Sequence, residues 1–161
     1  MKANLFVAII AIMVLTGCKK EDHSAAFTQL TADYFKAKNE LNPIDATFNG
    51  QTGYNDKLQL EMTEEYRSKQ REFIERFEKA LATIDTTTLD DEEKISFEII
   101  RWETGINKDL LQYPTNLIPL HQFWGTHLTM GQLAGATSAQ PFKNAKDYRD
   151  FHQRIEKYAV W

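Results

Sequence analysis

Apolar side chains recur at helical spacing along most of the chain. Steps of three and four residues place such side chains on one face of an α-helix, and four segments show these steps. The first segment begins near residue 25 and stops at Asn42-Pro43, because proline does not continue a helix. Its apolar positions are Phe27, Leu30, Tyr34 and Leu41.

A second helix is expected to begin after Thr63, whose hydroxyl can cap it. Glu64 and Glu65 follow, where negative charge favours the positive end of the helix dipole. One face of this helix carries the apolar residues Tyr66, Phe73, Phe77, Ala80, Leu81 and Ile84. Between this segment and the first, residues 44–61 have no helical period and contain turn-forming Asn and Gly residues, which predicts a loop.

The third helix has the longest apolar stripe. A short turn at 85–88 precedes it, so the second and third helices are expected to form an antiparallel hairpin. Thr88 and Asp91 resemble a capping box in which aspartate replaces glutamate. We expect Glu98 and Glu103 to be solvated and the stripe to face the core. The stripe consists of Ile95, Ile99, Trp102, Ile106, Leu110 and Tyr113.

Beyond Pro114 the chain is apolar but irregular up to Lys143, with only a short helix expected near 126–134. Such a segment is uncommon in a small domain unless it packs on something else. A last helix is predicted from Asn144, with Asp147 three residues on. Its apolar positions are Tyr148, Phe151, Ile155 and Tyr158. No residue typical of a helix end follows them, so we expect a truncated chain.

These patterns predict an all-α fold, a helical hairpin with flanking helices, as the N-terminal part of a larger and mostly helical protein. The expected organisation is a signal peptide at 1–17, a tether at 18–24 and a helical domain at 25–161. The signal peptide follows from Lys2, an apolar run, and the sequence Leu15-Thr16-Gly17-Cys18. The run is too short for a spanning helix, which needs about 20 apolar residues.

Cys18 is the only cysteine of the chain and lies where a bacterial lipoprotein receives its lipid. We therefore expect lipidation (palmitate) at Cys18, cleavage after Gly17 and attachment to the membrane through the lipid. Lys19 follows instead of aspartate, which favours the outer membrane of a Gram-negative cell envelope. The net charge of −4 argues against a nucleic-acid partner, which would require a basic face.

Candidate chemistry is sparse. The four histidines, including His121 and His127, do not form a His-Glu-x-x-His array, so we expect no metal and no cofactor in this chain. His121, Gln122, Trp124 and His127 are predicted to line a cleft, although packed loop residues are the alternative. The acidic run 90–93 is better explained by the dipole of the helix that follows. No catalytic residue is predicted.

Three stretches resemble one bacterial family in the expected order. They are the segment 42–50 followed by Tyr54, the segment Pro119-Leu120-His121-Gln122-Phe123-Trp124-Gly125, and the segment 147–155. Together they are similar to the family called domain of unknown function 885. Gln122, Gly125 and Arg154 match family positions, and we assign them structural roles.

This resemblance implies a helical, exported lipoprotein with a zinc motif of the His-Glu-x-x-His type in a distant C-terminal half. Zinc and a peptide substrate are therefore expectations for a full-length, peptidase-like parent, and no catalytic residue transfers to this chain. The alternative is a small helical binding lipoprotein that presents Phe123 and Trp124 to a partner. The DNA beyond codon 161 would distinguish the two, and the oligomeric state stays open.

Overall fold

The computed structural model describes residues 23–118, 120–135 and 138–161, and these ranges contain six α-helices, three 3-10 helices and no strand. The all-α prediction is confirmed. The predicted signal peptide and Cys18 lie outside the described residues. In chain order the elements are α2 (His23–Leu41), α3 (Pro43–Phe48), η1 (Thr52–Tyr54), α4 (Glu64–Leu81), η2 (Thr86–Thr88), α5 (Asp91–Leu110), η3 (Thr115–Leu117), α6 (Thr126–Leu133) and α7 (Ala145–Tyr158).

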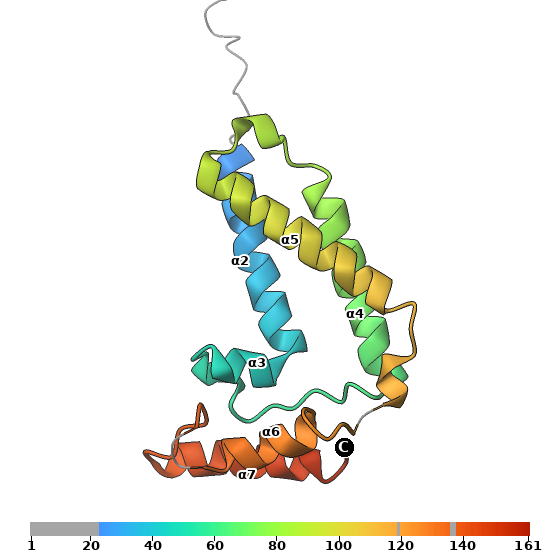
Figure 1. Cartoon of the computed structure of the whole chain (residues 1–161). Coiled ribbons are helices and arrows are strands. Elements are labelled where there is room, and N and C mark those ends of the chain that lie inside the picture. The colour runs from blue at the N-terminus through green and yellow to red at the C-terminus, as the bar shows by residue number, and fades with distance from the viewer. Residues whose placement is uncertain (1–22, 119, 136–137) are drawn as a thin grey trace, which may run out of the picture.

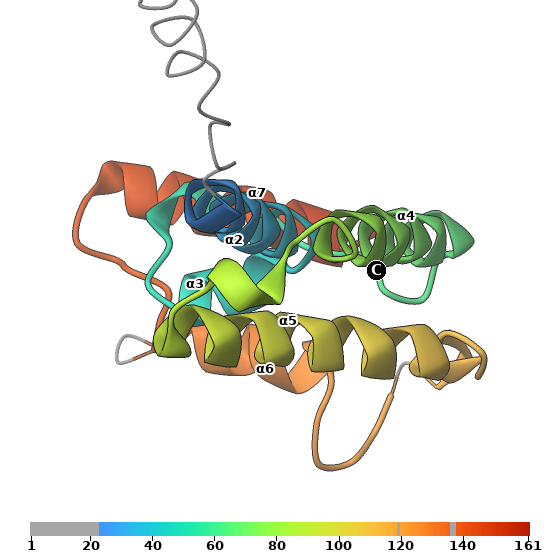
Figure 2. The same ribbon diagram turned by 90° about the horizontal axis from the view of Figure 1, so that it is seen from above.

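Three long helices, α2, α4 and α5, form the main bundle, and α6 and α7 lie across one end of it (Figure 1). Helix α4 packs against both α2 and α5. Seen from above, α2, α4 and α7 lie on one side and α5 and α6 on the other (Figure 2). The short η2 turn joins α4 to α5, which confirms the predicted hairpin. No helix in the described ranges is both long and apolar enough to cross a bilayer.

The main core lies where the three long helices meet. Tyr34 of α2 is at its centre, with its ring 5.2 Å from Phe73 and 5.1 Å from Phe77 of α4, between ring centroids. The predicted apolar faces of the first two helices therefore form the core, except for Leu41 and Tyr66, which line a hollow. Its buried members are Phe27, Leu30, Tyr34, Phe77, Leu81, Leu89, Phe97 and Ile100.

The predicted core stripe of α5 is wrong. Trp102 is 66% exposed and Ile99 is 56% exposed, whereas Phe97, Ile100 and Thr104 are buried. These three residues are spaced three and four apart, so they form a second face of the helix, opposite the stripe. Helix α5 thus has two apolar faces, and only the shorter one packs within the described residues. Apolar periodicity alone predicts that the longer stripe is buried, because it carries no information about which face meets the neighbouring helices.

Helix starts follow the expected chemistry, with one correction. The Thr63 hydroxyl accepts from the amide of Tyr66, as predicted. For α5 the capping box is formed by Asp90 and Glu93, whose side chains accept from each other's amides at 2.8 and 3.0 Å, and not by Thr88 and Asp91. The acidic run before α5 therefore serves to start a helix.

The structure confirms the predicted end of α2 and the predicted position of α6, but it contains one short helix, α3, that the sequence did not predict. Helix α2 ends at Leu41, directly before Asn42-Pro43, as predicted. The segment after it is not all loop, because α3 begins at Pro43 and buries Ile44, Ala46 and Thr47. Its six residues are too few to display a helical period in the sequence. Helix α6 confirms the short helix expected near 126–134.

Candidate functional site

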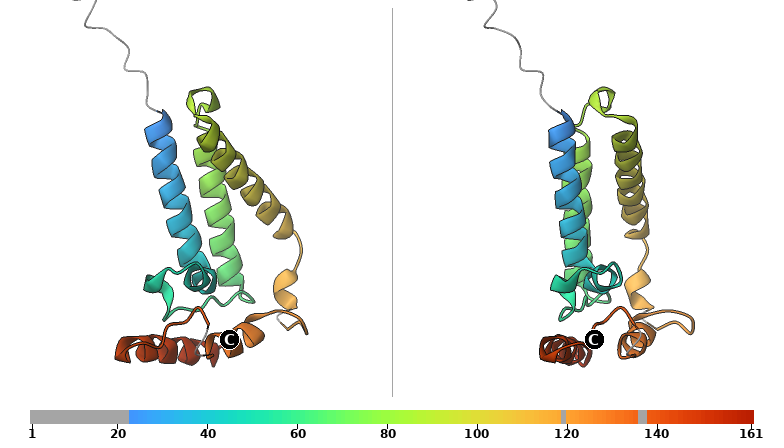
Figure 3. Two further views of the ribbon diagram at one scale, coloured as in Figure 1. Left: turned by 60° about the vertical axis from the view of Figure 1, so that its left-hand side comes forward. Right: turned by 90° about the vertical axis from the view of Figure 1, so that its left-hand side faces the viewer.

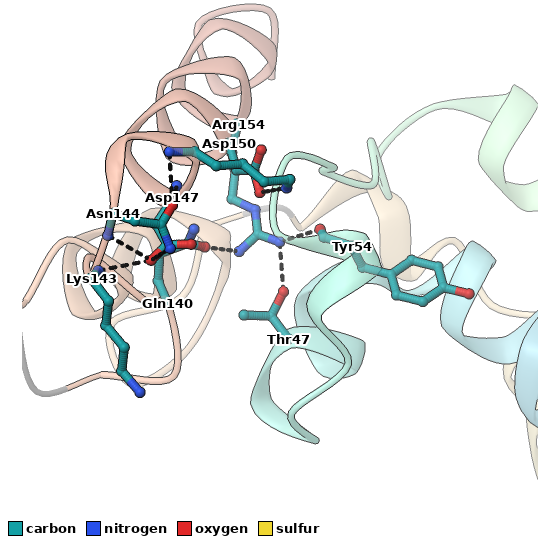
Figure 4. Close-up of polar contacts among 9 residues, drawn as sticks. Thr47, Tyr54, Gln140, Lys143, Asn144, Asp147, Asp150 and Arg154 are labelled. Atoms are coloured by element: carbon teal, nitrogen blue, oxygen red, sulfur yellow. Dashed lines mark hydrogen bonds and ion pairs between the residues drawn. The ribbon is translucent and has the colours of Figure 1, made fainter.

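Arg154 of α7 is fully buried and connects four parts of the chain (Figure 4). Its Nε donates to the Lys57 carbonyl at 2.8 Å, and one terminal nitrogen donates to Gln140 Oε1 at 2.9 Å. The other terminal nitrogen donates to the Tyr54 carbonyl at 2.6 Å and to the Thr47 hydroxyl at 2.7 Å. A planar guanidinium offers five donors in a fixed fork, and here all three of its nitrogens donate, in four hydrogen bonds. The side chain therefore ties α3, η1 and the segment after η1 to α7.

Every acceptor of Arg154 is neutral. Burial lowers the pKa of Arg154 to about 10, and the carboxylates of Asp56 and Asp150 act in the opposite direction. At neutral pH the guanidinium therefore stays charged, held by two carbonyls, an amide and a hydroxyl. A buried charge without a bonded counter-ion is costly unless its hydrogen bonds are made. All three nitrogens of the guanidinium already donate to groups of the protein itself. This arrangement therefore indicates a fixed structural role for Arg154, as assigned from the sequence.

Helix α7 is held in place at its N-terminus. The helix begins after Asn144 as predicted, Asn144 and Asp147 form a capping box, and the buried Asp147 carboxylate also accepts from the Lys143 amide at 2.7 Å. The predicted apolar face of α7 is partly wrong, because Tyr148 is 61% exposed and Ile155 is 44% exposed. The helix instead turns a polar face inward, and this polar contact is invisible to a pattern of apolar residues.

A second polar cluster lies between α2 and α5. The Tyr34 hydroxyl donates to Glu103 Oε2 at 2.9 Å, and Lys38 forms an ion pair with the same carboxylate. Burial first, and Glu103 second, raise the pKa of Tyr34 above its ordinary range. The prediction that Glu103 is solvated is wrong, because it sits on the side of α5 that faces α2.

Two hollows flank the place where α2 and α4 diverge. The larger, about 660 Å³, is lined by both helices and by the segment 57–60. The smaller, about 180 Å³, contains the Tyr34–Lys38–Glu103 cluster. Leu41 and Phe73 line both hollows, so these two side chains separate them. The left view of Figure 3 shows α2 and α4 side by side above the α6–α7 layer.

The four residues predicted to line a cleft lie in and after the loop that leads to α6. His121 stacks on Trp124, with ring centroids 3.5 Å apart and planes 11° apart, and accepts from the Phe123 amide. Trp124 is 65% exposed and Gln122 is also exposed. His127 is half-buried at the start of α6, and its Nδ1 has no partner in the described part of the chain. The structure therefore brings His121 and Trp124 together, and neither hollow beside α2 and α4 includes any of the four residues.

Metal-binding groups do not gather in the part of the chain that the structure describes. No three His, Cys, Asp or Glu side chains there lie close enough to hold an ion. A catalytic zinc requires three protein ligands and an open position. The described residues therefore do not fit the zinc centre that the resemblance implies for a longer parent.

Comparison with known proteins supports the resemblance seen in the sequence. Residues 43–161 match the family described as "Bacterial protein of unknown function (DUF885)". The chain belongs to the DUF885 family. No curated protein matches, and no solved structure matches. The DUF885 match begins at Pro43, the first residue of α3, and includes α3 to α7 and every residue of the Arg154 hub.

Sequence reasoning matched Arg154 to a family position but missed the residues that it joins. The one local signal was the spacing of Asp147 and Arg154, which places two charged residues on one face of α7. Thr47, Gln140 and the carbonyl groups gave no signal, because their role arises only when distant segments fold together. In this DUF885 chain the partners of Arg154 are therefore evident only from the structure.

Proposed function

We propose that this chain is a lipid-anchored lipoprotein of a Gram-negative cell envelope. In this proposal its helical domain is a non-catalytic N-terminal part of a larger, peptidase-like protein of the DUF885 family. Cys18, the acceptor of the lipid, attaches the domain to the outer membrane. The domain builds one wall beside the substrate cleft, with His121, Gln122, Trp124 and His127 as lining. The peptide substrate and the zinc belong to the rest of that protein.

The observation that carries this proposal is the outer face of α5. A helix that is apolar on two opposite faces is typical of one packed between two layers. Within the described ranges only the face with Phe97 and Ile100 is buried, and further exposed apolar side chains follow in the segment before α6. Exposed large apolar side chains gathered on a helix face are typical of an interaction site. Its most exposed members are Ile95 (62%), Trp102 (66%), Tyr113 (63%), Leu117 (73%), Ile118 (71%), Phe123 (74%) and Trp124 (65%).

A longer polypeptide is tested through Trp102. The gene is sequenced beyond codon 161, and any continuation of the reading frame is expressed together with this chain. Changing Trp124, Trp161 and every tryptophan of the continuation to Phe leaves Trp102 as the only tryptophan in both proteins. We expect acrylamide to quench Trp102 strongly in the 161-residue chain and weakly in the longer protein. An immediate stop codon, or equal quenching in both proteins, contradicts the proposal.

The lipid anchor is tested separately in a Gram-negative host. Cells expressing the chain are fed labelled palmitate, and the wild type is expected to take up label while Cys18→Ala does not. Equal labelling of both proteins contradicts lipidation at Cys18. Fractionation of the same cells distinguishes the outer membrane from the inner one.

A second candidate function, a stand-alone binding lipoprotein, is favoured by one observation. Phe123 and Trp124 extend from an exposed loop, where large aromatic rings are typical of contact residues. This function predicts a stop codon directly after codon 161 and loss of partner binding in Trp124→Ala. The reading frame beyond codon 161 therefore separates the two proposals.

A further inference from the structure

The segment 57–60 forms one side of the larger hollow, which we call its floor. Residues 57–60 form no helix and connect η1 to α4 across the end of the bundle (Figure 1). The amides of Leu58, Gln59 and Leu60 have no hydrogen-bond partner among the described residues, and neither do the carbonyls of Leu58 and Gln59. A row of unpaired backbone groups is a template for another extended chain.

The floor is held in position at its start by side chains of α7. Lys157 of α7 donates to the Asp56 carbonyl at 2.7 Å, and Arg154 of α7 donates to the Lys57 carbonyl. The Gln59 side chain also accepts from the Ile44 amide at 3.4 Å. These contacts fix the segment at its start, so its unpaired backbone groups need little further ordering when a ligand binds. Preorganisation of this kind reduces the entropic cost of binding.

The walls of the larger hollow offer apolar surface to a ligand. Leu41 of α2, Tyr66 and Phe73 of α4, and Leu58 and Leu60 of the floor supply apolar surface. A volume of about 660 Å³ is within the range typical of ligand sites, roughly 300–1,000 Å³.

The lining also carries charges of both signs without a charged partner. Glu40 of α2 and Glu72 of α4 form no ion pair in the described part of the molecule, and neither do Lys57 and Lys157. The remaining charged residues of the lining are paired, Lys69 with Glu65 and Arg76 with Asp33. A complementary ligand therefore carries both a basic and an acidic group.

From these features we infer that the hollow between α2 and α4 binds an extended peptide that pairs with the backbone of residues 58–60. Its alternate apolar side chains fill the space beside Leu41 and Phe73, and its basic and acidic side chains meet Glu72 and Lys157. Arg154 acts as a positioning residue for this site. The inference depends neither on lipidation nor on a longer polypeptide, so it stands or falls independently of the proposed function.

The probe is the fluorescein-labelled peptide acetyl-Glu-Val-Thr-Leu-Thr-Val-Lys-amide, mixed with the purified full chain. Binding is followed by fluorescence anisotropy and by hydrogen exchange. We expect the amides in the range 58–60 to exchange slowly only when the peptide is present. Two further peptides carry N-methyl groups on alternate amides, one for each edge of the strand. One of them is expected to bind about tenfold more weakly or worse, and the other to bind like the parent peptide, because only one edge pairs.

Matched variants locate the site. Ala37→Trp fills the hollow and is expected to abolish binding, whereas Ala32→Trp, on the exposed side of α2, leaves it unchanged. Glu72→Lys is expected to weaken binding of the lysine-containing peptide, whereas Glu75→Lys on the outer side of α4 is not.

Three results would overturn the inference. The first is unchanged exchange of the 58–60 amides at saturating peptide, a measurement on the wild type that does not depend on the folding of any variant. The second is equal binding of the two N-methylated peptides, which would indicate apolar adhesion without strand pairing. The third is binding that survives Ala37→Trp but is lost in Trp102→Ser, which would move the peptide to the outer face of α5.

Discussion

Arg154 of α7 donates to the hydroxyl of Thr47 in α3 across a separation of 107 residues. This bond joins the first helix of the family match to its last helix. Both partners are buried, so water offers neither of them a replacement. The position of α7 beneath the bundle therefore depends on a polar contact more than on the apolar face that the sequence suggested.

Removing this contact is expected to destabilise the protein. Arg154→Met removes the donors and leaves the buried Gln140 Oε1 and the Lys57 carbonyl without a partner. We expect the free energy of unfolding to fall by about 3–5 kcal/mol. Arg154→Lys should lose most of the same free energy, because an ammonium group does not reproduce the planar fork.

Urea unfolding followed by circular dichroism measures this loss. Arg149→Met, on the exposed side of the same helix, is the control and should change stability by less than about 0.5 kcal/mol. A loss below about 1 kcal/mol in both Arg154 variants would show that α7 is held mainly by other contacts.

Two tyrosines are expected to resist ionisation in the folded protein. Burial raises the pKa of Tyr34, with Glu103 adding to the effect, and burial raises the pKa of Tyr66, with Glu61 and Asp45 adding to it. The neutral form of each is favoured in the folded state. Their contribution to stability is therefore complete below the ordinary tyrosine pKa of about 10 and is lost as the pH rises above it.

Absorbance at alkaline pH tests this directly. Tyr34 and Tyr66, two of the six tyrosines, should ionise only at a pH well above the ordinary tyrosine pKa of about 10, or together with unfolding. Tyr34→Phe and Tyr66→Phe should each remove one group of raised pKa. Ionisation of all six in one normal step would contradict the prediction.

The sequence predicted the elements of this fold better than their contacts. Proline at position 43 and the caps at Thr63 and Asn144 are local signals, because a cap depends on residues within one turn. The same is true of the hairpin, which follows from the short turn before α5. Helix α3 was missed because it is too short to show a period.

The contacts required information that the sequence does not hold locally. Helix α5 offers a face with Trp102 and a face with Ile100, and which one is buried depends on the shape of α2 and α4. The Arg154 hub is a similar case, because two of its acceptors are backbone carbonyls, which every residue has. Tyr34 and Glu103 also meet only because α2 lies beside α5.

The chain by itself is expected to bind no zinc in stoichiometric amount and to cleave no peptide. His121 and His127 are six residues apart and do not form the ligand spacing of a catalytic site. Metal analysis of the purified chain after dialysis measures this. One zinc per chain, lost to a chelator together with peptide cleavage, would overturn the prediction and relocate catalysis to this domain.

The two faces of α5 should respond differently to truncation. Ile100 is 2% exposed and belongs to the core, so Ile100→Ala should lower the free energy of unfolding by about 2–5 kcal/mol through lost burial and a cavity. Trp102 is 66% exposed, so Trp102→Ala should cost less than about 1 kcal/mol in the 161-residue chain, although tryptophan is the larger side chain. Urea unfolding of the two variants under identical conditions compares them on one helix, with the same backbone and nearly the same distance from each end. A larger loss for Trp102→Ala than for Ile100→Ala would mean that the stripe, and not the face with Phe97, is the packed side of α5.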